Sequence, residues 1–125
     1  MPGLSLRKLL RRRRPAAPRP EQPDDARTLV FLTGALKGRR IPLEHKLILG
    51  RSATRCTVVF PEDLPGVSAV HCTIRRRGAT MTITDENSSY GTYVQGVRLI
   101  PGHAKILHRG QIITLGSEEQ TLTVK

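Results

Sequence analysis

The sequence has no tryptophan and only two phenylalanines and two tyrosines among its 125 residues. A hydrophobic core must therefore come from aliphatic side chains, and a domain of about a hundred residues can bury enough of them to fold alone. No apolar run approaches the roughly 18–20 residues of a membrane-spanning helix. The leucines near the start precede a block of arginines and lack the apolar stretch of about 7–15 residues that a secretory signal contains. We therefore expect a cytoplasmic protein.

Cysteine is scarce as well, because Cys56 and Cys72 are the only two. A structural zinc site needs Cys and His in closely spaced pairs. His71 and Cys72 beside one distant cysteine do not supply that spacing. We expect both cysteines to be reduced and buried, and we expect no metal and no other cofactor.

The usual signatures of catalysis are missing. Ser68, His71 and Asp85 supply the residue types of a hydrolase triad. There is, however, no G-x-S-x-G elbow and no glycine-rich nucleotide motif. A serine three residues before a histidine does not by itself pair a nucleophile with a base. The sequence therefore predicts no catalytic residue and no enzyme.

Acidic residues are few, since 21 Lys and Arg stand against 10 Asp and Glu, for a net charge of +11. Residues 1–27 contain eight cations and three acids, a net of +5, and residues 28–125 contain thirteen and seven, a net of +6. The first segment is thus far more basic per residue. The two segments need separate interpretations.

Residues 1–27 are predicted to form a disordered basic tail. An arginine run at 11–14 leads into 15–23, where four of nine residues are proline. Proline lacks the backbone donor and biases its neighbours toward extended states, so neither helix nor sheet is expected there. The basic block at 7–14 could make a weak contact with an anionic membrane or nucleic acid. A solvated tail without a structural role is the simpler interpretation.

The pattern changes at Thr28. Eleven short segments rich in β-branched residues and leucine are separated by turn signals, at 28–34, 39–44, 46–50, 56–60, 71–76, 80–84, 91–96, 97–100, 105–108, 111–116 and 121–125. In the segment TMTIT, Met81 and Ile83 alternate strictly with threonines. No window shows a sustained helical period. Many short strands with regular turns predict an all-β sandwich or barrel over residues 28–125.

Four short motifs fall at predicted strand ends or loops: LGRS at 49–52, VSAVHC at 67–72, NSSYGT at 87–92 and VQG at 94–96. The stretch 85–96 is predicted to be the tip of a β-hairpin. Arg51 offers a planar fork of donors, Ser68 and Ser89 offer short hydroxyls, and Gly91 allows close approach of the backbone. Together these groups suit a tetrahedral dianion such as phosphate.

In this order, with RGQIITLG and a closing strand after them, the motifs resemble the forkhead-associated (FHA) domain, in particular small single-domain FHA proteins of the bacterial type. The resemblance covers about residues 28–125. It implies an FHA-type β-sandwich of about eleven strands, preceded by the disordered tail, whose loops at one end bind phosphothreonine peptides.

The resemblance also implies roles for individual residues. Arg51 would contact the phosphate, Ser68 would donate its hydroxyl or its backbone N–H, and Ser89 would be a third phosphate contact. Ala69 and Tyr90 would face the peptide that flanks the phosphothreonine. Both depart from the family pattern, which often has a polar or basic residue at the first position and commonly an asparagine at the second. The remaining motif residues would brace or shape the loops: Gly50, His71, Gly91 and Thr92.

The leading hypothesis is a non-catalytic adaptor that binds a threonine-phosphorylated protein in Ser/Thr kinase signalling, with a kinase or its substrate as the partner. One alternative is a phosphate-independent protein–protein module with the FHA architecture. Another is a binder of anionic surfaces or nucleic acid driven by the basic tail. The scarcity of aromatic residues disfavours stacking on single strands, and a purely electrostatic contact would weaken steeply with salt.

Overall fold

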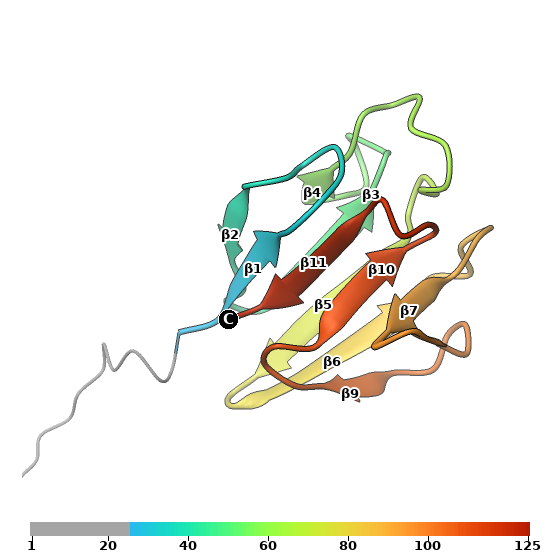
Figure 1. Ribbon diagram of the computed structural model, residues 1–125. Coiled ribbons are helices and arrows are strands. Elements are labelled where there is room, and N and C mark those ends of the chain that lie inside the picture. Colours follow the sequence, from blue (N-terminus) through green and yellow to red (C-terminus); the bar gives the residue numbers. More distant parts are fainter. Residues whose placement is uncertain (1–25) are drawn as a thin grey trace, which may run out of the picture.

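A computed structural model of the chain describes residues 26–125. Two β-sheets pack against each other (Figure 1), and this part of the chain contains eleven strands and no helix. No segment of residues 26–125 therefore forms an apolar helix of membrane-spanning length. The predicted all-β sandwich of about eleven strands is confirmed. The tail predicted for residues 1–27 lies, except for its last two residues, outside the described residues.

The first sheet has six antiparallel strands in the spatial order β2 (Arg40–Pro42), β1 (Thr28–Phe31), β11 (Thr121–Val124), β10 (Ile112–Leu115), β7 (Thr92–Val94) and β8 (Val97–Arg98). β1 and β11, the first and last strands along the chain, are neighbours in this sheet. The backbones of Thr28 and Lys125 exchange two hydrogen bonds of 2.9 Å. The start of the sandwich and the end of the chain therefore lie side by side (Figure 1).

The second sheet has five strands in the order β4 (Val58–Val59), β3 (Lys46–Gly50), β5 (Cys72–Arg77), β6 (Thr80–Asp85) and β9 (Lys105–Leu107). The β3–β4 pair is parallel, and the other pairs are antiparallel. A tight turn joins β5 to β6 at Gly78, whose φ of 63° is the left-handed conformation that glycine tolerates best.

Aliphatic side chains from both sheets fill the space between them. On β6, Met81 and Ile83 are buried while Thr80 is exposed and Thr82 half-buried, as the alternation predicts, but Thr84 at the end of the segment is buried as well. Phe31 and Phe60 meet edge to face across the sandwich, with ring centroids 6.0 Å apart. Cys56 and Cys72 are free and buried. Burial raises the pKa of both thiols, so they stay protonated at neutral pH.

Three loops meet at the end of the sandwich opposite the chain termini (Figure 1): 51–57 after β3, 60–71 after β4 and 86–91 after β6. The last of these crosses from the five-stranded to the six-stranded sheet. The prediction of a hairpin tip over 85–96 is therefore wrong. The hairpin in this region is that of β7 and β8, and it turns at Gln95 and Gly96, whose φ angles of 52° and 80° are typical of a type I′ turn.

Candidate functional site

A cavity of about 320 Å³ opens among these loops. Its lining includes the three predicted phosphate contacts, Arg51, Ser68 and Ser89, together with Tyr90. The other lining residues all come from the loop after β4: Asp63, Leu64, Pro65, Gly66 and Val67. The fold therefore brings distant motifs of the sequence to one place, and their contact with phosphate stays a prediction.

Arg51 directly follows the last residue of β3 and is half-buried. Its Nε donates a hydrogen bond to the carbonyl of Val67, and its Nη1 donates to the carbonyl of Glu62 at 2.6 Å. Within residues 26–125, Nη2 has no hydrogen-bond partner. The guanidinium is thus anchored on the loop after β4 and retains one nitrogen for a ligand.

Ser68 links two of the loops. The backbone N–H of Ser89 donates to Ser68 Oγ at 3.0 Å, and the backbone N–H of Ser68 donates to His71 Nδ1 at 3.0 Å. The N–H of Ser68 is therefore already in use, and of the two donors considered from the sequence only the hydroxyl proton remains for a ligand. The side chain of Ser89 is exposed beside it.

His71 lies completely buried beneath the cavity. Because Nδ1 accepts from Ser68, the ring proton of the neutral form must sit on Nε2, which donates to the carbonyl of Gly91 at 2.8 Å. Burial lowers the pKa of His71, and the Gly91 carbonyl and the charge of Asp85 only partly oppose this effect. A neutral His71 therefore ties the loop after β4 to the loop after β6.

A buried carboxylate, that of Asp85, organises the loop after β6, a role that was not predicted from the sequence. Asp85 accepts three hydrogen bonds: from the Ser88 hydroxyl at 2.5 Å, the Ser88 N–H at 3.1 Å and the Thr92 hydroxyl at 2.6 Å. The N–H of Gly91 donates to Ser88 Oγ at 3.0 Å. Of the serine pair, Ser88 is therefore structural and only Ser89 faces outward. An aspartate three residues before a serine, outside a helix, is a turn signal that could have shown this.

The predicted loop-shaping residues occupy tight positions. Gly91 has a φ of 89°, and a Cβ there would lie 2.5 Å from Arg98 Nε. A Cβ on Gly50 would lie 2.3 Å from the backbone carbonyl oxygen of Ala69, so this position has no room for a side chain. At Gly91 the Arg98 side chain could move, and the positive φ is what favours glycine. Thr92 is fully buried at the start of β7.

The two predicted peptide-flanking residues lie on different hollows. Tyr90 lines the cavity already described and is 62% exposed. Ala69 lines a second hollow of about 520 Å³, whose other lining residues are Arg51, Ser52, Ala53, Val59, Phe60 and Glu62. Arg51 is common to both hollows, so a peptide crossing the site would pass over it.

The charges around the cavity nearly balance. Arg51 is the only cation in its lining, and Asp63 is the only acid. No motif marks Asp63 in the sequence, because only the path of the loop places it near Arg51. This carboxylate works against an anionic ligand.

The three residue types of a hydrolase triad do not form one. His71 bonds the backbone of Ser68 and not its hydroxyl, while the Asp85 carboxylate is occupied by Ser88 and Thr92. Among residues 26–125, no three His, Cys, Asp or Glu side chains come together in a way that could hold a metal ion.

Residues 47–116 match the FHA domain family, and the chain belongs to this family. It is 28% identical over 93 residues to the probable serine/threonine-protein kinase fhkA of Dictyostelium discoideum. That match covers 68% of this chain and 15% of the kinase. The chain therefore corresponds to only a small part of the length of this relative.

Solved structures show the same fold. An FHA domain of an Arabidopsis thaliana hypothetical protein has a TM-score of 0.71 at 25% identity, with 81% of this chain and 85% of that chain covered. A domain solved in a study of phosphothreonine-dependent FHA interactions has a TM-score of 0.66 at 29% identity, covering 80% and 95%. EmbR of Mycobacterium tuberculosis, in complex with a low-affinity phosphopeptide, has a TM-score of 0.66 at 27% identity, covering 80% and 24%.

Proposed function

We propose that the chain is a non-catalytic adaptor that binds threonine-phosphorylated proteins in Ser/Thr kinase signalling. The observation that carries the proposal is that Arg51, Ser68 and Ser89 line one cavity at the loop end of an FHA domain. The relatives support it, since one similar domain comes from work on phosphothreonine-dependent interactions, EmbR was solved with a phosphopeptide, and fhkA is a probable Ser/Thr kinase. The partner is then a kinase or one of its substrates.

Each donor has an acceptor in a phosphate dianion. Nη2 of Arg51 and the hydroxyls of Ser68 and Ser89 can donate to different phosphate oxygens, and hydrogen bonds to charged groups contribute about 1.5–3 kcal/mol each. The two carbonyls that hold Arg51 also reduce the conformational entropy that the side chain loses on binding. The site is therefore preorganised for recognition.

Tyr90 determines what lies beside the phosphate. An asparagine amide could bond a peptide backbone as both donor and acceptor, whereas tyrosine offers one hydroxyl on a rigid ring. The ring is exposed at the cavity and can pack against an apolar side chain. The adaptor is thus expected to prefer an apolar residue next to the phosphothreonine.

An oriented phosphothreonine peptide library, with its unphosphorylated counterpart, tests the proposal on the full chain. Calorimetry on the best peptide should show binding that disappears when the phosphate is removed. Enrichment of apolar residues near the phosphothreonine should accompany it.

One observation favours a phosphate-independent protein–protein module as the second candidate. Asp63 places a carboxylate in the lining of the same cavity as Arg51, where it repels a dianion. Equal affinity for the phosphorylated and unphosphorylated peptides would select this alternative.

A further inference from the structure

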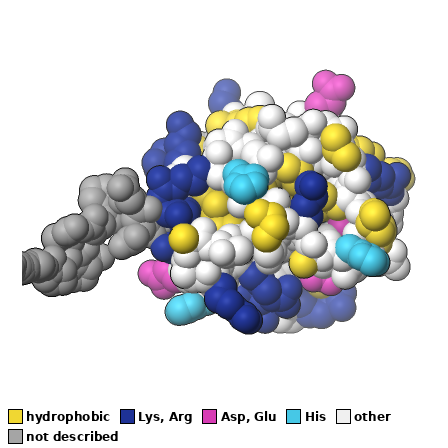
Figure 2. All heavy atoms as spheres, turned by 90° about the horizontal axis from the view of Figure 1, so that it is seen from below, with side chains coloured by type: hydrophobic (Ala, Val, Ile, Leu, Met, Phe, Trp, Pro, Cys, Tyr) yellow, Lys and Arg dark blue, Asp and Glu magenta, His cyan; other side chains and the backbone are white. Residues whose placement is uncertain are grey.

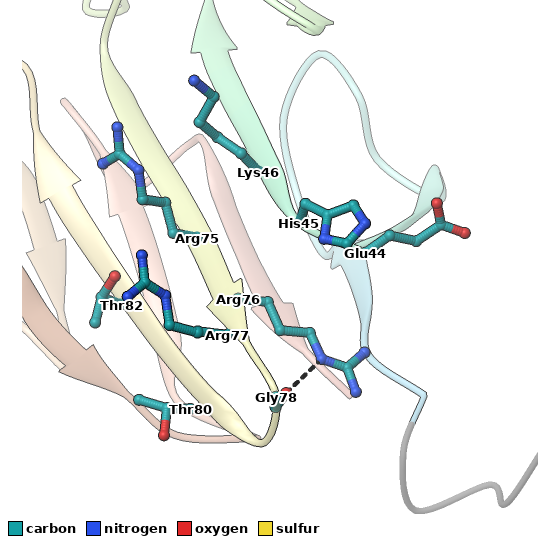
Figure 3. A pocket seen from close by; sticks show the side chains of 9 residues that line it. All are labelled: Glu44, His45, Lys46, Arg75, Arg76, Arg77, Gly78, Thr80 and Thr82. Carbon is teal, nitrogen blue, oxygen red and sulfur yellow. Dashed lines mark hydrogen bonds between the residues drawn. The ribbon is translucent and has the colours of Figure 1, made fainter. Parts of the chain in front are cut away.

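A separate hollow of about 860 Å³ lies on the outer face of the five-stranded sheet. Its lining residues are Glu44, His45, Lys46, Arg75, Arg76, Arg77, Gly78, Thr80 and Thr82, shown in Figure 3. It surrounds the start of β3 and the β5–β6 hairpin, whereas Arg51 follows the other end of β3. The hollow and the cavity lined by Arg51, Ser68 and Ser89, the proposed phosphate cavity, therefore lie at opposite ends of the sheet.

Sheet register sets three cations on one face. Lys46 of β3 is the cross-strand partner of Arg75 of β5, and Arg77 follows two residues later on the same strand. Figure 3 shows the side chains of Arg75 and Arg77 extending in the same direction from β5, while Arg76 points to the opposite side. We call Lys46, Arg75 and Arg77 the cationic row.

The cationic row carries an electrostatic cost that the fold does not offset. Like charges directly opposite each other on neighbouring strands are destabilising. Among residues 26–125, the side chains of the row form no ion pair and no hydrogen bond. The one acid in the lining, Glu44, points away from the row (Figure 3). Arg76, in contrast, donates to the carbonyls of Gly78 and Leu43 and has a structural role.

We propose that this hollow is a second binding surface, which takes an extended acidic segment of a partner protein. Side chains on the same face of an extended chain repeat about every 6.4–6.8 Å, and Arg75 and Arg77 on β5 share this repeat. Carboxylates at alternate positions of the segment can therefore pair with both guanidinium groups. The hydroxyls of Thr80 and Thr82, cross-strand partners of Arg77 and Arg75, can donate to the same segment.

The neighbouring residues favour a polypeptide over nucleic acid. Ile106 on β9 is 50% exposed and is the cross-strand partner of Thr82, so an apolar contact adjoins the charged row. The lining has no Trp, Tyr or Phe on which bases could stack. Three cations are also fewer than the roughly six to ten phosphate contacts of typical duplex-binding proteins. Figure 2 shows Lys and Arg side chains in several patches on the face that it draws, so the charge contribution of the row itself must be isolated by matched variants.

Fluorescence anisotropy of the full chain with an unphosphorylated peptide that alternates glutamate and threonine tests this surface. The double variant R75Q/R77Q should bind the peptide about five- to tenfold more weakly, as expected for the loss of two exposed ion pairs. The control R39Q/R40Q, which removes two exposed arginines at β2 of the other sheet, should change the affinity less than about twofold, because neither residue lines the hollow and salt screens exposed charges. A glutamine-for-glutamate peptide should not bind.

Two further measurements separate this surface from the phosphate cavity and from other polyanions. R75Q/R77Q should keep its phosphopeptide affinity and should melt no lower than the wild type, because it removes like charges from neighbouring strands. Arg51→Lys should keep its affinity for the acidic peptide. Equal weakening by R75Q/R77Q and R39Q/R40Q would overturn the proposal, as would loss of acidic-peptide binding in Arg51→Lys. It would also be overturned if the double variant lost affinity for duplex DNA or phosphatidylserine vesicles while its affinity for the acidic peptide stayed the same.

Discussion

Arg51 combines two tasks at the scale of a single residue. Two carbonyls of the loop after β4 accept hydrogen bonds from Nε and Nη1, and Nη2 has no hydrogen-bond partner within residues 26–125. The same side chain therefore supports the loop and, in our proposal, recognises the phosphate. Ser68 also has two roles. Its backbone N–H donates to His71, while its hydroxyl proton stays available for a ligand.

Arg51→Ala should lower phosphopeptide affinity by at least about tenfold, because a lost hydrogen bond to a charged group is worth about 1.5–3 kcal/mol. Arg51→Lys should not restore it, since an ammonium cannot reach two carbonyls and a phosphate with the geometry of a planar fork. Calorimetry gives the affinities, and Arg55→Ala, an exposed cation in the loop after β3, is the control. Unchanged affinity in Arg51→Ala would remove this residue from the site.

Asp63→Asn should tighten phosphopeptide binding, because it removes the one negative side chain from the cavity lining. Binding of the unphosphorylated peptide should not change. Calorimetry at low and high salt should show that the gain shrinks as salt screens the charge. Glu44→Gln, which removes an exposed acid at the opposite end of the sheet, should have no effect. If Asp63→Asn binds both peptides more tightly, the carboxylate does not act on the phosphate.

At the scale of elements, a buried carboxylate and a buried imidazole hold the binding loops. Asp85, 1% exposed at the end of β6, accepts three hydrogen bonds and directs the chain across to the other sheet. His71 joins this loop to the loop after β4. The cavity therefore depends on residues that do not line it.

Asp85→Asn should lower the free energy of unfolding by about 1–3 kcal/mol, because an amide cannot accept all three hydrogen bonds and leaves buried donors unsatisfied. For a domain of this size, each kcal/mol corresponds to roughly 4–8 °C in melting temperature. Ser89→Ala is the matched control: it should leave the melting temperature unchanged in calorimetric scans but weaken phosphopeptide binding. A stable Asp85→Asn variant would contradict the structural role of the network.

His71 should make stability depend on pH. Its pKa is lowered in the folded protein, chiefly by burial, so below about pH 6.5 the unfolded chain binds a proton that the folded chain excludes. The free energy of unfolding should therefore fall as the pH drops from about 6.5 toward the lowered pKa of the folded state. Melting temperatures measured across this range should show the fall.

His71→Gln provides the comparison for this pH dependence. It should be less stable at pH 8, since a flexible amide does not reproduce the two hydrogen bonds that the rigid ring makes to Ser68 and Gly91. Its melting temperature should, however, vary less between about pH 7 and pH 5. The three other histidines, His45, His103 and His108, are exposed and remain in both proteins. An equally steep decline in His71→Gln would assign the pH dependence to another group.

At the scale of the whole molecule, the two ends of one sheet serve different ligands in our proposals. The phosphate cavity lies at the loop end, and the cationic row lies near the β5–β6 hairpin. The basic tail is a third source of charge, with a net of +5 over residues 1–27. In the described sandwich, the first residue of β1, Thr28, is hydrogen-bonded to the last residue of the chain, Lys125.

Deletion of residues 1–25 should leave phosphopeptide affinity nearly unchanged, because all residues that line the cavity lie between positions 51 and 90. The same deletion should weaken salt-sensitive association with anionic vesicles or DNA, since the arginine-rich block is removed. Anisotropy and vesicle sedimentation at two salt concentrations measure both effects. A large loss of phosphopeptide binding would make the tail part of the recognition surface.

The strands were predictable because their signal is local. The alternation of Met81 and Ile83 with threonines shows a half-buried strand in the sequence itself, and the structure has that strand with that inward face. The path of 85–96 was not predictable in this way. A turn after Asp85 is compatible with a hairpin or with a crossing between sheets, and only the pairing of β7 with β10 decides which occurs.

The sequence by itself determined the all-β class, the eleven strand segments and the three loop residues that are candidates for phosphate contact, because periodicity and turn chemistry act over a few neighbouring residues. Tertiary structure alone decided that Asp63 shares a cavity with Arg51 and that Lys46 stands opposite Arg75. Each of these depends on sheet register and on hydrogen bonds between loops far apart in the chain. Such long-range pairing is set by burial of the common core, which the local pattern of a single segment does not encode.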